Sequence, residues 1–173
     1  KSGFAEIIKH GFISEDSLLE QILNIGLPLT AEQITPELIQ NSLSQKNKII
    51  SQDFKDQNLR MALNFGHTAG HAFEMLSLKS AYPLLHGEAI ALGMLYEMLL
   101  SQVLLNLPGN SISLLKKLLI RCGLLTSLPF EIELSEFLQQ IKGDKKQAQG
   151  QVKWALLEAP QKIKINSIAT IDE

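Results

Sequence analysis

The spacing of apolar side chains predicts a mainly helical chain. Near the start, Phe4, Ile7, Ile8 and Phe12 recur every three to four residues, which places them on one face of a helix. The same spacing returns several times, bounded by glycines, prolines or small polar residues that begin or end helices. We predict helices over residues 4–11, 18–24, 36–50, 86–105, 113–121 and 135–141.

Capping signals mark three of these helix starts. Thr35 followed by Pro36 is typical of an N-cap with proline at the first helical position. The polar run 14–17 is expected to cap the second helix, and Ser135 the last one. A further helix, which carries two histidines, is expected to begin near residue 60 or 64 and to end by residue 79.

Alternation replaces the helical spacing near the C-terminus. Residues 151–157 and 162–166 alternate between apolar and polar side chains on either side of a turn, which predicts a small β-hairpin. No internal repeat, low-complexity tract or second domain boundary is present. We therefore predict a mainly α fold: a single domain over residues 1–173, built as a bundle of about seven helices with one β-hairpin.

Composition narrows the functional classes. The chain carries 16 basic and 18 acidic residues, a net charge of -2, and has no basic stripe, which argues against a nucleic-acid partner. The apolar run 89–100 is interrupted by Gly93 and Glu97 and is too short to span a membrane. The single cysteine, Cys122, excludes an internal disulfide and is compatible with the cytoplasm. Because Lys1 already lies in a structured pattern with no signal peptide, we expect the chain to begin inside a longer protein.

Three of the four histidines fall within twenty residues. His67 and His71 are four apart, so both imidazoles lie on one helix face, and His86 follows nineteen residues after His67. Gly66, Gly70 and Gly87 stand beside them. Because glycine weakens a helix, three of them here indicate that a metal ion, a substrate or a neighbouring helix approaches the backbone closely.

This cluster favours a metal site over packed histidines. Neutral imidazole is the commonest nitrogen ligand of zinc, and a catalytic zinc keeps three protein ligands and one open position. A carboxylate is a natural third ligand, and spacing alone leaves Glu6, Glu74 and Glu88 as candidates.

Basic residues could complete such a site. Each is by itself usually a solvated charge, and Glu6 with Lys9, three residues apart, usually forms a surface ion pair. Gathered around a metal, they would bind an anionic, oxygen-rich substrate such as a sugar phosphate. The basic residues concerned are Lys9, Lys46, Arg60, Lys145 and Lys146.

Four further motifs stand out along the chain: Arg60-x-x-Leu-Asn-x-Gly-His-Thr-x-Gly-His-Ala-x-Glu74, His86-Gly-Glu-Ala89, Ala5-Glu-Ile-Ile-Lys-His-Gly11 and Asp144-Lys-Lys146. Together they resemble the 3-dehydroquinate synthase family. They match its C-terminal, helical, metal-binding domain, occur in the family's order and together span nearly the whole chain.

The resemblance implies a reaction of the shikimate pathway to aromatic amino acids. The family converts the sugar phosphate 3-deoxy-arabino-heptulosonate 7-phosphate to 3-dehydroquinate and phosphate, as a lyase that uses NAD and Zn²⁺ or another divalent cation such as Co²⁺. Its members form homodimers. Their N-terminal half, which holds NAD on a glycine-rich turn, has no counterpart in this sequence, so we expect a fragment that does not turn over substrate alone.

The resemblance also implies residue roles. The metal ligands would be Glu6, His67 and His86, and His71 would handle a proton or contact substrate. Other substrate contacts would come from Lys9, Lys46, Arg60, Asn64, Asp56, and one or both of Lys145 and Lys146.

Three departures affect the loop before Arg60. Asp56 stands where the family usually has glutamate, so its role transfers less directly. Asn58 replaces a usual glycine and Phe54 an acidic residue, and neither change removes a ligand.

Three alternatives remain open. The first is another sugar phosphate cyclase with the same metal and NAD chemistry. The second is a metal-dependent alcohol dehydrogenase such as glycerol dehydrogenase, against which the basic residues argue, because a neutral alcohol does not need them. The third is a non-catalytic helical interaction domain whose histidines are merely packed.

Overall fold

The computed structural model describes residues 2–25, 33–54, 59–143 and 151–170 of the chain. Within them, helices precede an antiparallel pair of strands, so the predicted fold class is confirmed. The elements are α1 (Ser2–Ile13), α2 (Leu18–Asn24), α3 (Pro36–Gln52), the 3-10 helix η2 (Leu59–Asn64), α4 (His67–Ser77), α5 (His86–Leu105), α6 (Gly109–Arg121), α7 (Leu134–Lys142), β1 (Gln151–Ala159) and β2 (Lys162–Thr170).

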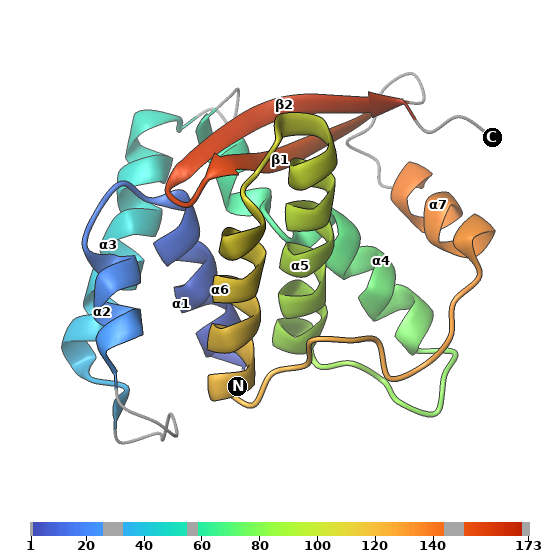
Figure 1. Ribbon diagram of the computed structural model, residues 1–173, viewed down its shortest axis with the longest axis horizontal. Coiled ribbons are helices and arrows are strands. Elements are labelled where there is room, and N and C mark those ends of the chain that lie inside the picture. Colours follow the sequence, from blue (N-terminus) through green and yellow to red (C-terminus); the bar gives the residue numbers. More distant parts are fainter. Residues whose placement is uncertain (1, 26–32, 55–58, 144–150, 171–173) are drawn as a thin grey trace.

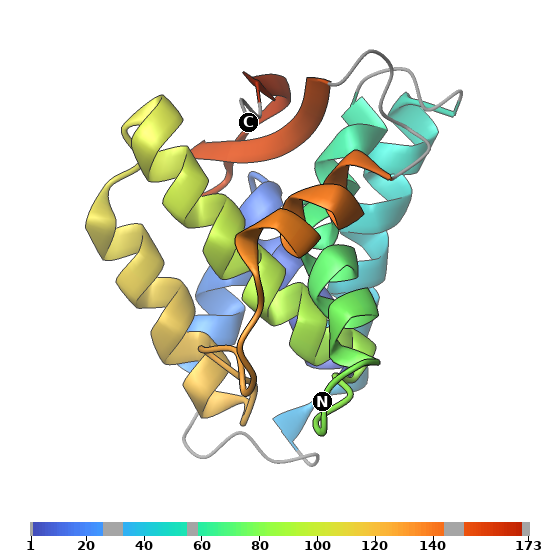
Figure 2. The ribbon, with the colours of Figure 1, turned by 90° about the vertical axis from the view of Figure 1, so that its right-hand side faces the viewer.

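Helix α5 is the centre of the fold. It contacts α1, α4, α6 and β1, and Figures 1 and 2 show it running through the middle of the molecule. Its length and composition alone would also suit a membrane-spanning helix. Its central position accounts for that composition, because a helix covered on several sides is apolar around most of its circumference.

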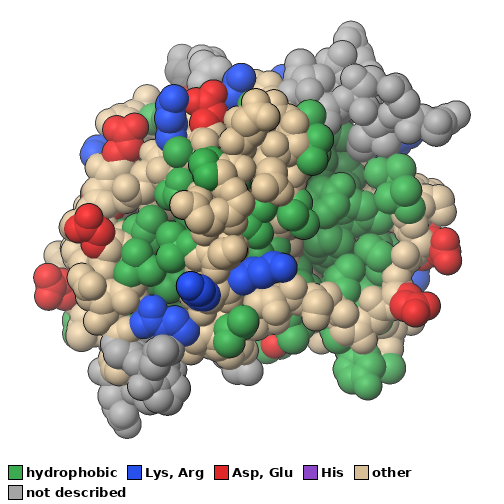
Figure 3. Space-filling model, in the orientation of Figure 1, with side chains coloured by type: hydrophobic (Ala, Val, Ile, Leu, Met, Phe, Trp, Pro, Cys, Tyr) green, Lys and Arg blue, Asp and Glu red, His purple; other side chains and the backbone are tan. Residues whose placement is uncertain are grey.

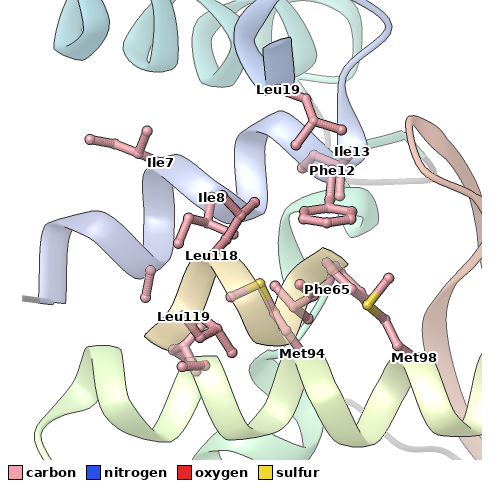
Figure 4. Packing of buried hydrophobic residues seen from close by; sticks show 14 of the residues in the cluster. Ile7, Ile8, Phe12, Ile13, Leu19, Phe65, Met94, Met98, Leu118 and Leu119 are labelled. Atoms are coloured by element: carbon pink, nitrogen blue, oxygen red, sulfur yellow. The ribbon is translucent and has the colours of Figure 1, made fainter. Parts of the chain in front are cut away.

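Two apolar clusters hold the helices around α5. In the first, Ile8 and Phe12 of α1 pack with Leu118 of α6 and with Met94 and Met98 of α5 (Figure 4). All five side chains are fully buried. Since burying one such side chain contributes about 1.5–3 kcal/mol, this cluster fixes α1 against α5.

The second cluster is aromatic and joins α4, α5, α7 and β1. Phe73 and Phe137 stack with ring centroids 4.9 Å apart, and Tyr96 contacts Phe137 edge-on at 5.1 Å. Trp154 lies 6.1 Å from Tyr96. These rings hold α4 beside α5, and therefore also hold the histidines that α4 carries.

The hairpin lies across the ends of the central helices (Figure 1). Strands β1 and β2 are longer than predicted and pair with Trp154 opposite Ser167. The Gln161 amide donates to Phe12 O at 2.8 Å, and the Leu157 amide donates to Ser101 Oγ at 3.0 Å. The hairpin therefore bonds directly to α1 and α5.

Capping was predicted only in part. Thr35 accepts a hydrogen bond from the Leu38 amide at 3.2 Å, as expected. In the run 14–17, Asp16 accepts the bond from the Leu18 amide. The prediction that Ser135 caps the last helix was wrong. Helix α7 begins at Leu134, and Glu133 occupies its N-cap position.

The predicted start of the histidine helix was also wrong. Residues 59–64 form the separate 3-10 helix η2, and α4 begins only at His67. Between them Gly66 adopts a left-handed conformation with φ 79°, which ends one helix and redirects the chain. The break makes His67 the first residue of α4.

Charged side chains are scattered over the face seen in Figure 3. Acidic groups lie mainly at the upper left and on the two sides of this face, and basic groups lie at the upper left and in a short row across the lower middle. Apolar side chains gather between α5 and α7, and no histidine is visible on this face.

Candidate metal centre

Three helices bring three histidines and two carboxylates together. The imidazole centroids of His67, His71 and His86 lie 5.3–5.9 Å apart. Glu6 of α1 adds a carboxylate whose Oε1 is 3.5 Å from His67 Nε2. Among the residues that the structure describes, two groups of three could hold a cation, with ligand atoms within 4.8 Å of one another: Glu6, His67 and His86, or His71, Glu74 and His86.

Glycines allow this convergence. A Cβ on Gly87 would lie 2.2 Å from Ser2 Cα, so the first turn of α5 touches the start of α1. A Cβ on Gly93 would lie 2.0 Å from Gly66 O and 2.6 Å from Gly70 N. The close approach inferred from the sequence is therefore helix against helix at these positions.

The pair of Glu6 and Lys9 is not a surface ion pair, contrary to the usual interpretation. Lys9 is only 3% exposed, and its Nζ donates to Glu6 Oε2 at 2.7 Å and to Leu63 O at 2.9 Å. Burial lowers the pKa of Lys9, although Glu6 opposes this. Burial raises the pKa of Glu6, but attraction to Lys9 outweighs it and leaves that pKa below its usual value. Lys9 thus keeps a negative carboxylate beside the histidines.

His67 presents a lone pair to that carboxylate. Its Nδ1 lies 3.2 Å from Phe65 O, and since a carbonyl only accepts, Nδ1 carries the proton. Burial, assisted by Lys9, lowers the pKa of His67 to about 4, so the ring is neutral near pH 7. Among the described residues, buried Glu6 Oε1 has no hydrogen-bond partner. Two electron-rich atoms facing each other at 3.5 Å fit a bound cation.

Glu74 orients the third histidine. His86 Nδ1 lies 3.1 Å from Glu74 Oε2, the arrangement in which a carboxylate fixes the tautomer of a metal-binding imidazole. Because neutral imidazole has one lone pair, His86 can then serve a cation only through Nε2. This favours Glu6, His67 and His86 as ligands, with Glu74 behind His86.

Glu88, the third carboxylate considered from the sequence, has another role. Its Oε2 accepts a hydrogen bond from the Leu85 amide at 3.1 Å, at the start of α5. It is in neither of the two possible ligand groups. Glu88 therefore caps the helix that carries His86.

An open hollow of about 480 Å³ adjoins Glu6 between α1 and α3. Lys46 and the fourth histidine, His10, line it together with apolar side chains. Lys46 is exposed there, so an anion bound near Glu6 could reach its ammonium group.

The remaining predicted site residues lie on or near η2. Arg60 is the second residue of this segment and Asn64 is its last, and both are half-buried. The structure thus places them on the segment that leads into His67. Asp56, Lys145 and Lys146 lie outside the described residues.

Two buried polar residues were not recognised from the sequence as buried. His10 is 3% exposed and its Nδ1 lies 2.7 Å from Ser42 Oγ, while Glu97 is fully buried in α5. The signal for Glu97 was available, since a carboxylate inside an apolar run needs a buried partner. His10 lies in the motif Ala5–Gly11, but the motif by itself did not indicate that this histidine is buried.

Acid should destabilise the metal-free chain through its buried histidines. Burial, with Lys9 nearby, lowers the pKa of His10 from 6.5 to about 4, so the unfolded chain binds the proton first. Protonation of His10 leaves the free energy of unfolding unchanged above pH 6.5 and lowers it as the pH falls toward 4. At 1.36 kcal/mol per pKa unit, the loss from His10 is about 3 kcal/mol. Urea unfolding across this range measures it.

The matched variant is His10→Asn, which keeps a polar atom near Ser42 but does not titrate. Its free energy of unfolding should depend less steeply on pH. An unchanged pH dependence would show that His10 is accessible to protons in the folded chain.

Two solved structures share this fold. One is 2-deoxy-scyllo-inosose synthase complexed with carbaglucose-6-phosphate, NAD⁺ and Co²⁺, with a TM-score of 0.73, 22% identity, and coverage of 94% of this chain and 44% of that one. The other is 2-epi-5-epi-valiolone synthase from Streptomyces hygroscopicus with NAD⁺ and Zn²⁺ bound, with a TM-score of 0.75, 19% identity, and coverage of 99% and 46%. The shared fold is that of a helical domain found in these synthases.

Sequence comparison identifies the family. The chain belongs to the 3-dehydroquinate synthase C-terminal family, which matches residues 3–147. It is 35% identical over 167 residues to the 3-dehydroquinate synthase of Thermodesulfovibrio yellowstonii, covering 95% of this chain and 46% of that protein. It is 37% identical over 174 residues to that of Caldanaerobacter subterraneus, covering 98% and 48%. The chain spans about half the length of the curated relatives it matches.

Proposed function

We propose that this chain is the metal- and substrate-binding part of a 3-dehydroquinate synthase. The whole enzyme would convert 3-deoxy-arabino-heptulosonate 7-phosphate to 3-dehydroquinate and phosphate, as a carbon–oxygen lyase of the shikimate pathway. Family membership supports this reaction. The structural observation that carries it is the lone pair of His67 Nε2 facing the unpartnered Glu6 Oε1 at 3.5 Å, beside His86.

Glu6, His67 and His86 would hold Zn²⁺ or a similar divalent cation such as Co²⁺. The two solved synthases of the same fold contain these two metals. Bound here, the cation would supply a Lewis acid for a substrate hydroxyl. Three protein ligands leave a position open, as a catalytic site requires.

The chain's own groups would bind and orient the substrate. Lys9 uses two of its three N–H groups on Glu6 and Leu63, which leaves one for a substrate oxygen. Lys46 presents a second cation on the hollow beside Glu6. Arg60 and Asn64 would add contacts from η2, the guanidinium suiting a carboxylate or phosphate. The resemblance adds Asp56, Lys145 and Lys146.

His71 would move a proton at the substrate. It lies one turn after His67 on α4, with ring centroids 5.3 Å apart, and its side chain is exposed. An imidazole outside the ligand group keeps a nitrogen free for acid–base work near neutral pH.

The rest of the enzyme would come from residues outside this chain. The sequence contains no Gly-x-Gly-x-x-Gly turn, so NAD would be held mainly by the N-terminal domain, whose presence in the whole protein is part of this proposal. We also propose a homodimer in the cytoplasm, as the family resemblance and the lone cysteine suggest.

A second candidate is another sugar phosphate cyclase, which the fold shared with the two solved synthases supports. Buried Lys9 beside Glu6 argues against an alcohol dehydrogenase, because a small neutral alcohol needs no such cation. The unpartnered Glu6 Oε1 argues against merely packed histidines.

The test is turnover by the whole protein and by its His71→Ala variant. The wild type should act on 3-deoxy-arabino-heptulosonate 7-phosphate, and the variant should keep stoichiometric metal while kcat falls about 100-fold or more. Metal analysis and phosphate release measure the two effects.

Each contrary result has a distinct meaning. No turnover of this substrate by the metal-loaded whole protein would favour another cyclase. Loss of metal from His71→Ala would show that His71, with Glu74 and His86, holds the cation instead of His67.

A further inference from the structure

Glu97 occupies an unusual place for a carboxylate. It lies in α5 with no exposed surface. Its Oε2 accepts a hydrogen bond from the Gly66 amide at 2.7 Å, and its Oε1 accepts one from the Ala69 amide at 3.2 Å. A residue from one helix therefore binds the first turn of another.

These bonds replace a missing cap. The first amides of a helix have no partner within the helix, and a side chain at the N-cap residue usually accepts from them. In α4 that residue is Gly66, which has no side chain to do so. Glu97 supplies the acceptor from α5.

Helix α5 provides both the space and the cap. Gly93 lies one turn before Glu97 and lets the α4 backbone approach, since its Cβ would collide with Gly66 O and Gly70 N. Gly66, in turn, has a left-handed φ that a side chain would strain, and its Cβ would lie 2.5 Å from Met94 Cγ. The start of α4 is thus held against α5 at a fixed distance.

His67 is the residue that this arrangement positions. It stands between Gly66 and Ala69, and the amides of both residues donate hydrogen bonds to Glu97. Its own Nδ1 bonds to Phe65 O, so backbone contacts on both sides fix the ring. Its Nε2 then faces Glu6 Oε1 at 3.5 Å.

We propose that Glu97 is a positioning residue for the metal site, which sets the affinity for the cation by fixing His67 through the first turn of α4. Glu97 itself does not touch the cation. This inference rests on the proposed metal site of Glu6, His67 and His86. It adds that the buried contact of Glu97 with the Gly66 and Ala69 amides controls metal binding, although Glu97 is not a metal ligand.

The test is Co²⁺ binding by this chain with Glu97→Gln. Glutamine keeps one acceptor oxygen but turns an NH₂ group toward an amide that needs an acceptor. We expect Co²⁺ affinity to fall about 10- to 100-fold, the range found when a contact behind a ligand is lost. The visible absorption of the bound Co²⁺ should also change, because His67 moves.

Ser101→Ala is the matched control. Ser101 is one turn further along α5, is also fully buried, and accepts a hydrogen bond from β1 at Leu157 instead of from α4. Its loss should lower the stability but leave Co²⁺ affinity within about twofold and the spectrum unchanged. Equal losses of affinity in both variants would reduce Glu97 to a general stabilising role and overturn the proposal.

A measurement on the wild type covers the case in which Glu97→Gln does not fold. Because linkage is reciprocal, saturating Co²⁺ should slow hydrogen exchange of the Gly66 and Ala69 amides about tenfold. The Leu157 amide should not respond. Unchanged exchange at Gly66 and Ala69 would overturn the role of Glu97.

The outcomes also separate this inference from the proposed function. A wild-type chain that binds no Co²⁺ would refute the metal site, and the inference would fall with it. A wild-type chain that binds Co²⁺, with Glu97→Gln binding equally well, would refute the inference alone.

Discussion

His67→Ala is expected to lower the affinity of the chain for Zn²⁺ or Co²⁺ about 100-fold or more while leaving the fold intact. His67 faces Glu6 Oε1 at 3.5 Å with its only lone pair, so its removal leaves two protein ligands. Structural zinc sites with four ligands bind with about 10–16 kcal/mol, or about 3 kcal/mol per ligand, which corresponds to a factor of about 100. Competition titration with a chromophoric chelator measures the change.

His71→Ala serves as the control on the same helix. It removes an imidazole 5.3 Å from that of His67 but outside the proposed ligand group. Its metal affinity should stay near that of the wild type. If His71→Ala lost the cation and His67→Ala kept it, the group His71, Glu74 and His86 would be the metal site.

Gly93→Ala is expected to destabilise the fold by about 3 kcal/mol or more. The added Cβ would lie 2.0 Å from Gly66 O and 2.8 Å from Gly70 Cα, so it meets backbone atoms that cannot rotate away. Overpacking of a core by one methyl group typically costs about 1–3 kcal/mol, and here the α4 backbone itself must move. Urea unfolding of the two proteins gives the difference.

Gly3→Ala is the matched control in a neighbouring helix. A Cβ on Gly3 would meet no atom within 4 Å, and Gly3 is exposed in α1. Alanine there should stabilise the chain by about 0.5–1 kcal/mol through helix propensity. A Gly93→Ala variant as stable as the wild type would mean that α4 and α5 separate at little cost, and that their contact does not set the position of His67.

Local patterns predicted the helices well where the sequence contains both an apolar periodicity and residues that begin or end the helix. Helix α5 runs over His86–Leu105, as its apolar run predicted, and Thr35 caps α3. The prediction failed at Gly66, where the histidine helix breaks. A glycine is compatible with both a continuous helix and a left-handed turn, and only its contact with α5 decides between them.

The sequence alone determined the mainly helical fold, the family resemblance and the four-residue spacing of His67 and His71, because helical periodicity and motifs are local properties of a chain. The tertiary structure decided which carboxylates join them. Glu6 and Glu74 approach the imidazoles, while Glu88 caps its own helix. It also decided that Lys9 and Glu97 are buried beside the site. These contacts depend on how α1, α4 and α5 pack together. They could not be predicted from the sequence, because periodic patterns report local structure and not contacts between distant segments.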